Sequence, residues 1–99
     1  MKRCEITLPL GYNNGDQIEA EKFYVTKQEL VDKFGGISIN RHWSGSWRSK
    51  GKVYNDSNVL FQINIPDEEV PFMKEYKKVL EERFQQIEIQ IVFIDISVL

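Results

Sequence analysis

Apolar and polar residues alternate in three parts of the chain, and this pattern predicts β-strands. The first strand is predicted over residues 2–8, and Pro9 ends it because proline cannot donate a hydrogen bond to a sheet. The region 37–65 predicts a long hairpin, with its turn inside the serine- and glycine-rich stretch 44–52. A last strand is predicted over residues 87–98.

Strict alternation assigns faces to the two strands of the hairpin. On the first strand, the residues expected to share one face are Ile37, Ile39, Arg41 and Trp43. On the return strand, Val59, Phe61, Ile63 and Ile65 are expected to face the core, whereas Leu60 faces outward. The polar residues 55–58 have low β-strand propensity, which predicts a bulge or bend there.

Two stretches repeat apolar residues at helical spacing. The first helix is predicted from Thr26, because Thr26 and Glu29 have the spacing of a capping box, to Phe34, before a glycine pair. The second is predicted to begin near Asp67 as its N-cap and to end at residue 84 or 86. Residues 17–25 fit either a short extra strand or an ordered loop.

The predicted order is strand, helix, strand, strand, helix, strand. This order indicates an α+β, ferredoxin-like split βαβ fold, in which a four-stranded antiparallel sheet carries two helices on one face. A single domain over residues 1–99 is expected, because 99 residues provide one core. An alternative is a five-stranded sheet that includes residues 17–25.

Composition narrows the class of protein. A hydrophobic fraction of 41% and a charged fraction of 28% are typical of a globular domain. The sequence contains no apolar run long enough to span a membrane, and its N-terminus lacks the apolar segment of a secretory signal. One cysteine, Cys4, cannot form an internal disulfide, so we expect a cytoplasmic protein with a buried, unreactive thiol.

Several short segments are familiar as a group. They are Phe34-Gly35-Gly36-Ile37-Ser38, Gly45-Ser46-Trp47 and Gly51-Lys52-Val53-Tyr54-Asn55-Asp56, with Leu8-Pro9-Leu10 and Phe84-Gln85-Gln86 at the ends. This set resembles small bacterial and phage domain families of ferredoxin-like fold. The resemblance implies the fold over most of the chain, and it transfers no catalytic residue.

The predicted hairpin is basic and aromatic, although the whole chain has a net charge of −2. No acid occurs between Asp32 and Asp56. That interval contains the cations Lys33, Arg41, Arg48, Lys50 and Lys52, together with His42, Trp43, Trp47 and Tyr54. Because arginine and lysine bind phosphate and indole rings stack on bases, the hairpin predicts a site for a nucleotide-type anion.

Within this hypothesis the residues have separate roles. The ligand-binding residues are predicted to be Arg41, Trp43, Trp47, Lys50, Lys52 and Asp56. The catalytic candidates are His42 and Tyr54 for proton transfer and Arg48 for charge stabilisation. They would form a metal-independent phosphodiesterase that acts on cyclic oligonucleotides or RNA, with chemistry similar in a general sense to that of ring nucleases. A single histidine and a single cysteine offer no metal-ligand spacing, and no cofactor is expected.

Two other hypotheses stay open. One is a non-catalytic protein- or RNA-binding or assembly module, and the other is a structural oligomer whose tryptophans are buried between subunits. A homodimer is expected in either case, because the last strand is apolar on both faces from Val92 onward. The residues of its second face are Val92, Ile94, Ile96 and Val98. The alternative is that residues 17–25 cover this strand within one chain.

Overall fold

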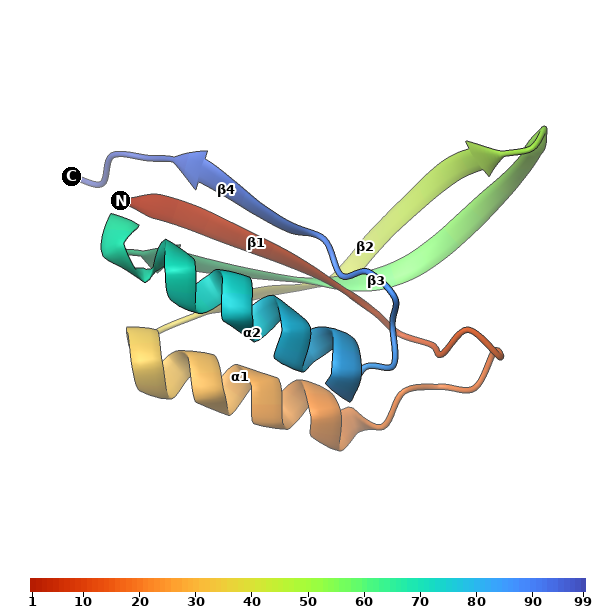
Figure 1. Ribbon diagram of the computed structural model, residues 1–99, viewed down its shortest axis with the longest axis horizontal. Coiled ribbons are helices and arrows are strands. Elements are labelled where there is room, and N and C mark those ends of the chain that lie inside the picture. The colour runs from red at the N-terminus through yellow and green to blue at the C-terminus, as the bar shows by residue number, and fades with distance from the viewer.

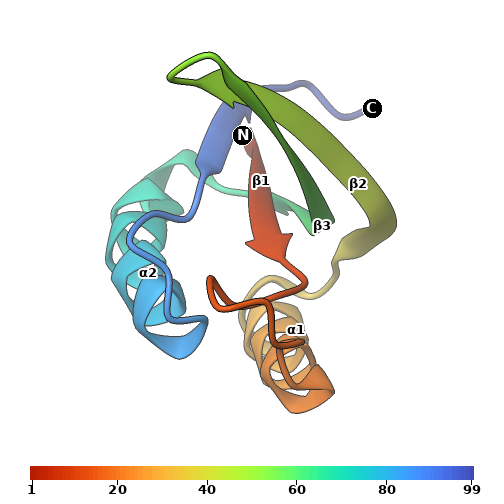
Figure 2. The same cartoon turned by 90° about the vertical axis from the view of Figure 1, so that its right-hand side faces the viewer.

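A computed structural model describes residues 1–99 as one antiparallel sheet with two helices (Figure 1). The elements are β1 (Lys2–Pro9), α1 (Ala20–Phe34), β2 (Ser38–Ser49), β3 (Lys52–Ile65), the 3₁₀ turn η1 (Asp67–Glu69), α2 (Val70–Arg83) and β4 (Ile91–Asp95). The strand order is β2-β3-β1-β4, with every neighbouring pair antiparallel. Both helices lie on the same face of the sheet (Figures 1 and 2). The predicted ferredoxin-like fold is therefore confirmed.

The core lies between the helices and one face of the sheet. Alternate residues of β1 (Cys4, Ile6 and Leu8) are fully buried there. The inward residues of β3 that the sequence predicts (Val59, Phe61, Ile63 and Ile65) are buried with them, against Leu30 of α1 and Met73, Tyr76 and Leu80 of α2. Cys4 is a small buried core residue, as predicted, and loss of solvation raises the pKa of its thiol to about 12.

Helix α1 begins six residues earlier than the sequence predicts. Residues 20–25 form its first turns, so the extra strand is not formed, and only one isolated bridge joins Gly11 to Gln17. The predicted capping box is wrong, because Thr26 lies inside the helix and its hydroxyl donates to the Lys22 carbonyl at 2.7 Å. The predicted C-terminus is confirmed: Gly35 adopts a left-handed conformation and donates to the Val31 carbonyl.

A polar network joins the two helices where Thr26 is buried. The Arg83 guanidinium donates to the Thr26 hydroxyl at 2.8 Å and to both carboxylate oxygens of Glu29, at 2.7 and 3.0 Å. The Tyr76 hydroxyl donates to the same carboxylate at 2.7 Å. These donors, Arg83 first, lower the pKa of Glu29, and burial together with the Glu29 contact raises the pKa of Tyr76. Glu29 therefore fixes α1 against α2.

The last strand is shorter than predicted. Residues 87–90 lie outside β4, and Ile87 is 93% exposed. β4 is an edge strand paired with β1 alone, and its register places Val92 beside Glu5 and Ile94 beside Arg3. These residues share the sheet face opposite the helices, which we call the open face. The proposal that residues 17–25 cover this strand is wrong, because residues 20–25 belong to α1 on the other face (Figure 1).

The second helix ends at Arg83, slightly before the predicted residue 84 or 86, and the prediction that Asp67 is its N-cap is wrong. Asp67 begins the turn η1, and the α-helix follows from Val70 with a proline in its first turn. No helix is both long enough and apolar enough to cross a membrane.

Candidate binding surface on the projecting hairpin

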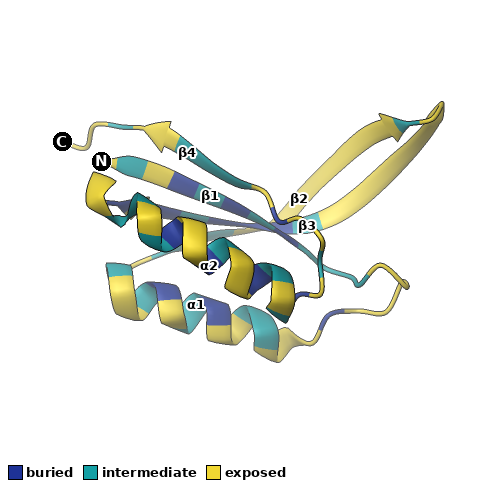
Figure 3. Ribbon diagram, in the orientation of Figure 1, coloured by how far each residue is buried: buried dark blue, intermediate teal, exposed yellow.

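Strands β2 and β3 continue beyond the body of the protein as a two-stranded ribbon (Figure 1). We call residues 41–57 the arm. Every residue of the arm except Ser49 is exposed (Figure 3). The arm turns at Lys50 and Gly51, whose φ angles of 52° and 77° are both positive, as in the two-residue turn that matches strand twist.

A β-bulge sits where the arm leaves the sheet. Asn40 pairs with Leu60 and Trp43 pairs with Asn58, so Arg41 and His42 together face the single residue Val59. The irregularity therefore lies on β2, not in the polar run 55–58 where the sequence predicts it. The backbone amide of His42 donates to the side-chain oxygen of Asn40 at 3.0 Å, which secures the bulge.

The bulge changes the face on which the following side chains lie. Ile39 pairs with Phe61 and faces the helices, whereas Trp43 pairs with Asn58, which is on the open face. The prediction that Ile39 and Trp43 share a face is therefore wrong, because one extra residue inverts the alternation. Leu60 does point to the open face, but it is only 3% exposed, because it sits in an inner strand between two neighbours.

The aromatic side chains gather on the side of the arm that continues the open face. Trp47 and Tyr54 are cross-strand neighbours, and their rings stack with centroids 4.5 Å apart. The indole nitrogen of Trp47 donates to Asp56 at 2.7 Å, and the Lys52 ammonium lies over the Tyr54 ring at 5.4 Å. Trp43, Trp47 and Tyr54 are 43%, 50% and 38% exposed. This aromatic side thus presents three large rings to its surroundings.

The cations do not gather with the rings. Strand alternation puts Arg48 on the opposite side of the arm, where Ser46 donates to Asn55 at 2.6 Å. Lys50 is in the turn, and Arg41 faces a cavity beside α1. Of the predicted ligand-binding residues, the structure brings together Trp43, Trp47, Lys52 and Asp56.

The three predicted catalytic residues lie apart within one chain. His42 is in the bulge at the base of the arm, whereas Tyr54 and Arg48 are nearer the tip, on opposite sides. No three His, Cys, Asp or Glu side chains lie close enough together to hold a metal ion.

The arm and the body enclose a hollow of about 810 Å³. Besides the aromatic side of the arm, its walls come from the end of β1, the loop after it and the segment before β4: Pro9, Gly11, Tyr12, Asn13, Gln86, Glu88 and Gln90. None of these residues is among the site residues that the sequence predicts. The glycine-rich composition of residues 11–16 was the only local signal for them.

The element order and the strand order β2-β3-β1-β4 define a ferredoxin-like fold, which solved structures of CutA1 and of a PII-like protein CutA share. No protein-family model matches the chain, and no curated protein matches it significantly. The chain is similar to the divalent cation tolerance protein CutA1 from Thermus thermophilus, with a TM-score of 0.71 and 19% identity. That match covers 99% of this chain and 86% of the other.

Two further solved structures are similar. The PII-like protein CutA from Nostoc sp. PCC 7120 matches with a TM-score of 0.70 and 15% identity, over 98% of this chain and 82% of the other. A phage SAM lyase in complex with S-methyl-5′-thioadenosine matches with a TM-score of 0.64 and 13% identity, over 95% and 80% of the chains. At these identities the likeness shows the fold alone.

Proposed function

We propose that this protein is a non-catalytic binding module that assembles with copies of itself, and that the aromatic side of the arm and the open face of the sheet form the contact. The observation that carries this proposal is the exposure of three aromatic rings on a two-stranded ribbon against which no helix or further strand packs (Figure 1). A two-stranded hairpin alone is marginally stable in water. Covering one half-exposed ring would contribute roughly 2–3 kcal/mol by area transfer.

The charge distribution favours a second copy of this chain as the partner that the arm contacts. The arm carries four cations and one acid, and the rest of the chain carries nine cations and fourteen acids. An arm of one copy is therefore opposite in charge to the body of another, which speeds encounter and fixes orientation. The open face also offers apolar contact at Val92 and at Ile94, which is 41% exposed. A dimer is the simplest closed assembly that would use both surfaces.

Sedimentation equilibrium at micromolar concentration tests the proposal. We expect a homo-oligomer for the wild type, and dissociation in a Trp43→Ser/Trp47→Ser variant and, independently, in Ile94→Glu. The matched control is Val79→Ser, which removes an equally exposed apolar residue from α2. A single 11.7 kDa species in the wild type would refute self-assembly, and an intact oligomer in both variants would refute this interface.

A second candidate function is binding of a nucleotide-type ligand in the hollow between arm and body. Stacking on an aromatic side chain contributes about 1–3 kcal/mol per base, and the exposed rings of Trp43 and Trp47 line this hollow beside polar groups. The similar phage SAM lyase structure contains S-methyl-5′-thioadenosine, which is an adenine nucleoside. Calorimetry with nucleosides and nucleotides tests this candidate, and Trp47→Ser should weaken binding while Val79→Ser should not.

Phosphodiesterase activity would require a second copy. Because His42, Arg48 and Tyr54 lie apart in one chain, the chemistry would need groups from another copy in the same site. Incubation of the oligomer with cyclic oligoadenylate or RNA in EDTA tests for this activity. Absence of product would leave the binding module as the function. We also propose a cytoplasmic location, because the single cysteine is a buried thiol that forms no disulfide.

A further inference from the structure

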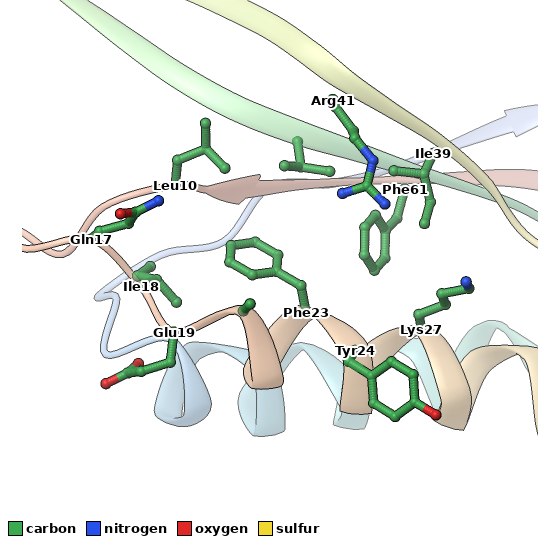
Figure 4. Close-up of a pocket in the computed structure, with 12 residues that line it drawn as sticks. Leu10, Gln17, Ile18, Glu19, Phe23, Tyr24, Lys27, Ile39, Arg41 and Phe61 are labelled. Carbon is green, nitrogen blue, oxygen red and sulfur yellow. The ribbon is translucent and has the colours of Figure 1, made fainter.

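A cavity of about 590 Å³ lies on the other side of the sheet, between the N-terminal half of α1 and the bend of β2 and β3 (Figure 4). Eight of its twelve lining residues are hydrophobic. Besides Ala20 and Tyr24, these are Leu10, Ile18, Phe23, Ile39, Val59 and Phe61. Its volume is in the range of cavities that bury small molecules.

The cavity follows from the way in which the arm leaves the body. Ile39 is the last residue of β2 that packs against the core, and every residue from Arg41 to Arg48 is exposed. The edge strand therefore gives no apolar side chain to cover Phe23 and Phe61 at this corner. The bulge contributes as well, because it turns Trp43 to the open face, away from the cavity.

Two cations lie at this apolar cavity without a carboxylate partner. The guanidinium of Arg41 points into the cavity toward Phe61 and Ile39, and Lys27 of α1 lines the same end of the cavity (Figure 4). Neither residue takes part in any of the seven ion pairs in the structure. The one acid among the lining residues, Glu19, is at the other end and is engaged by Tyr12 and Lys22.

We propose that this cavity binds a small organic carboxylate with an apolar aryl or acyl body. The body lies against Phe23, Phe61 and Ile39, and the carboxylate accepts hydrogen bonds from Arg41 and Lys27. Arginine offers two parallel donors that fit a carboxylate, and lysine adds a point charge. The site does not depend on the assembly proposed above, because it uses the opposite face of the molecule.

The probe for the test is 2-naphthoate, with 2-naphthalenemethanol as its neutral isostere. Calorimetry on the wild-type protein is expected to show saturable binding of the carboxylate and at least tenfold weaker binding of the alcohol. Arg41→Gln and Lys27→Gln should each weaken naphthoate binding about tenfold, and Ala20→Phe, which fills the cavity, should abolish it. Arg48→Gln is the matched control on the arm, and its affinity should equal that of the wild type.

Circular dichroism and thermal unfolding establish that each variant is folded before its affinity is compared. Arg41 and Ala20 are exposed, so their replacement leaves the core intact. Any of three results would overturn the proposal: no binding of naphthoate at millimolar concentration, equal affinity for the acid and the alcohol, or unchanged affinity in Arg41→Gln. A loss of binding in Arg48→Gln would instead place the ligand on the arm and would also overturn it.

Discussion

Replacing Arg83 with methionine should destabilise the protein by about 2 kcal/mol, because it removes the centre of the network between α1 and α2. The Arg83 side chain is 18% exposed and makes three hydrogen bonds to Thr26 and Glu29. Hydrogen bonds to charged groups contribute roughly 1.5–3 kcal/mol each when they are buried. The Glu29 carboxylate is 43% exposed, so solvent screening reduces the total to about 2 kcal/mol.

Thermal and urea unfolding measure this loss. For a chain of this length, about 2 kcal/mol corresponds to a decrease in Tm of roughly 8–16 °C. The matched control is Lys78→Met, which removes an exposed ion pair with Glu75 at 3.4 Å and should change stability by less than about 0.5 kcal/mol. A double-mutant cycle with Glu29→Gln isolates the pair, and we expect a coupling energy of about 1–2 kcal/mol.

The same pair should make stability depend on pH. Arg83 lowers the pKa of Glu29 in the folded state, so folding holds this carboxylate in its charged form. The stabilisation is complete above the usual glutamate pKa of about 4.3 and is lost as the pH falls through the lower folded value. The decrease in stability on acidification should therefore be smaller in Arg83→Met. Equal acid sensitivity in the two proteins, or a coupling energy near zero, would refute this reasoning.

Three further predictions concern single positions. Gly35→Ala should lower stability by about 1 kcal/mol in urea unfolding, because φ at Gly35 is +86° and a β-carbon there is strained even though nothing crowds it; an unchanged midpoint would contradict this. Lys50→Asn should slow hydrogen exchange of the arm about threefold, because asparagine tolerates the positive φ of 52° better than lysine; faster exchange would contradict it. The Cys4 thiol, whose pKa is raised to about 12, should react with a thiol reagent at pH 8 only after denaturant is added; rapid labelling of the native protein would show that it is accessible.

The strands could be predicted from sequence because alternation directly reflects which side of a sheet is buried. Strand β3, Lys52–Ile65, ends at the residue where the predicted hairpin 37–65 ends, and the turn before it lies within the predicted stretch 44–52. The sequence predicts helix α1 too short, because contacts that stabilise this helix come from distant parts of the chain. Thr26 has the appearance of an N-cap, yet its hydroxyl is buried against Arg83, 57 positions away in the sequence. A helix that depends on such a partner has no local signal for its first turns.

The sequence predicts the composition of the candidate site but not its geometry. The basic and aromatic residues of the arm are evident from the sequence, but their distribution over its sides depends on the bulge at Arg41 and His42. Such a bulge is a property of two paired strands, so neither strand alone reveals it. For the same reason the hollow between arm and body could not be predicted, since its other walls come from residues 9–13 and 86–90.

The bulge also separates two kinds of recognition within a short stretch of chain. Without the bulge, strict alternation through residues 41–43 would put Arg41 and Trp43 on one face, and a cation beside an indole would suit a phosphate-bearing base. With it, Trp43 joins Trp47 and Tyr54 on the open side, and Arg41 points into the cavity beside α1. Deleting His42 should remove the bulge and make Arg41 and Trp43 consecutive, so that Arg41 pairs with Val59 and Trp43 with Asn58, on opposite sides as before. If our two proposals are correct, that deletion should leave both self-assembly and naphthoate binding in place, whereas Arg41→Gln should weaken only naphthoate binding.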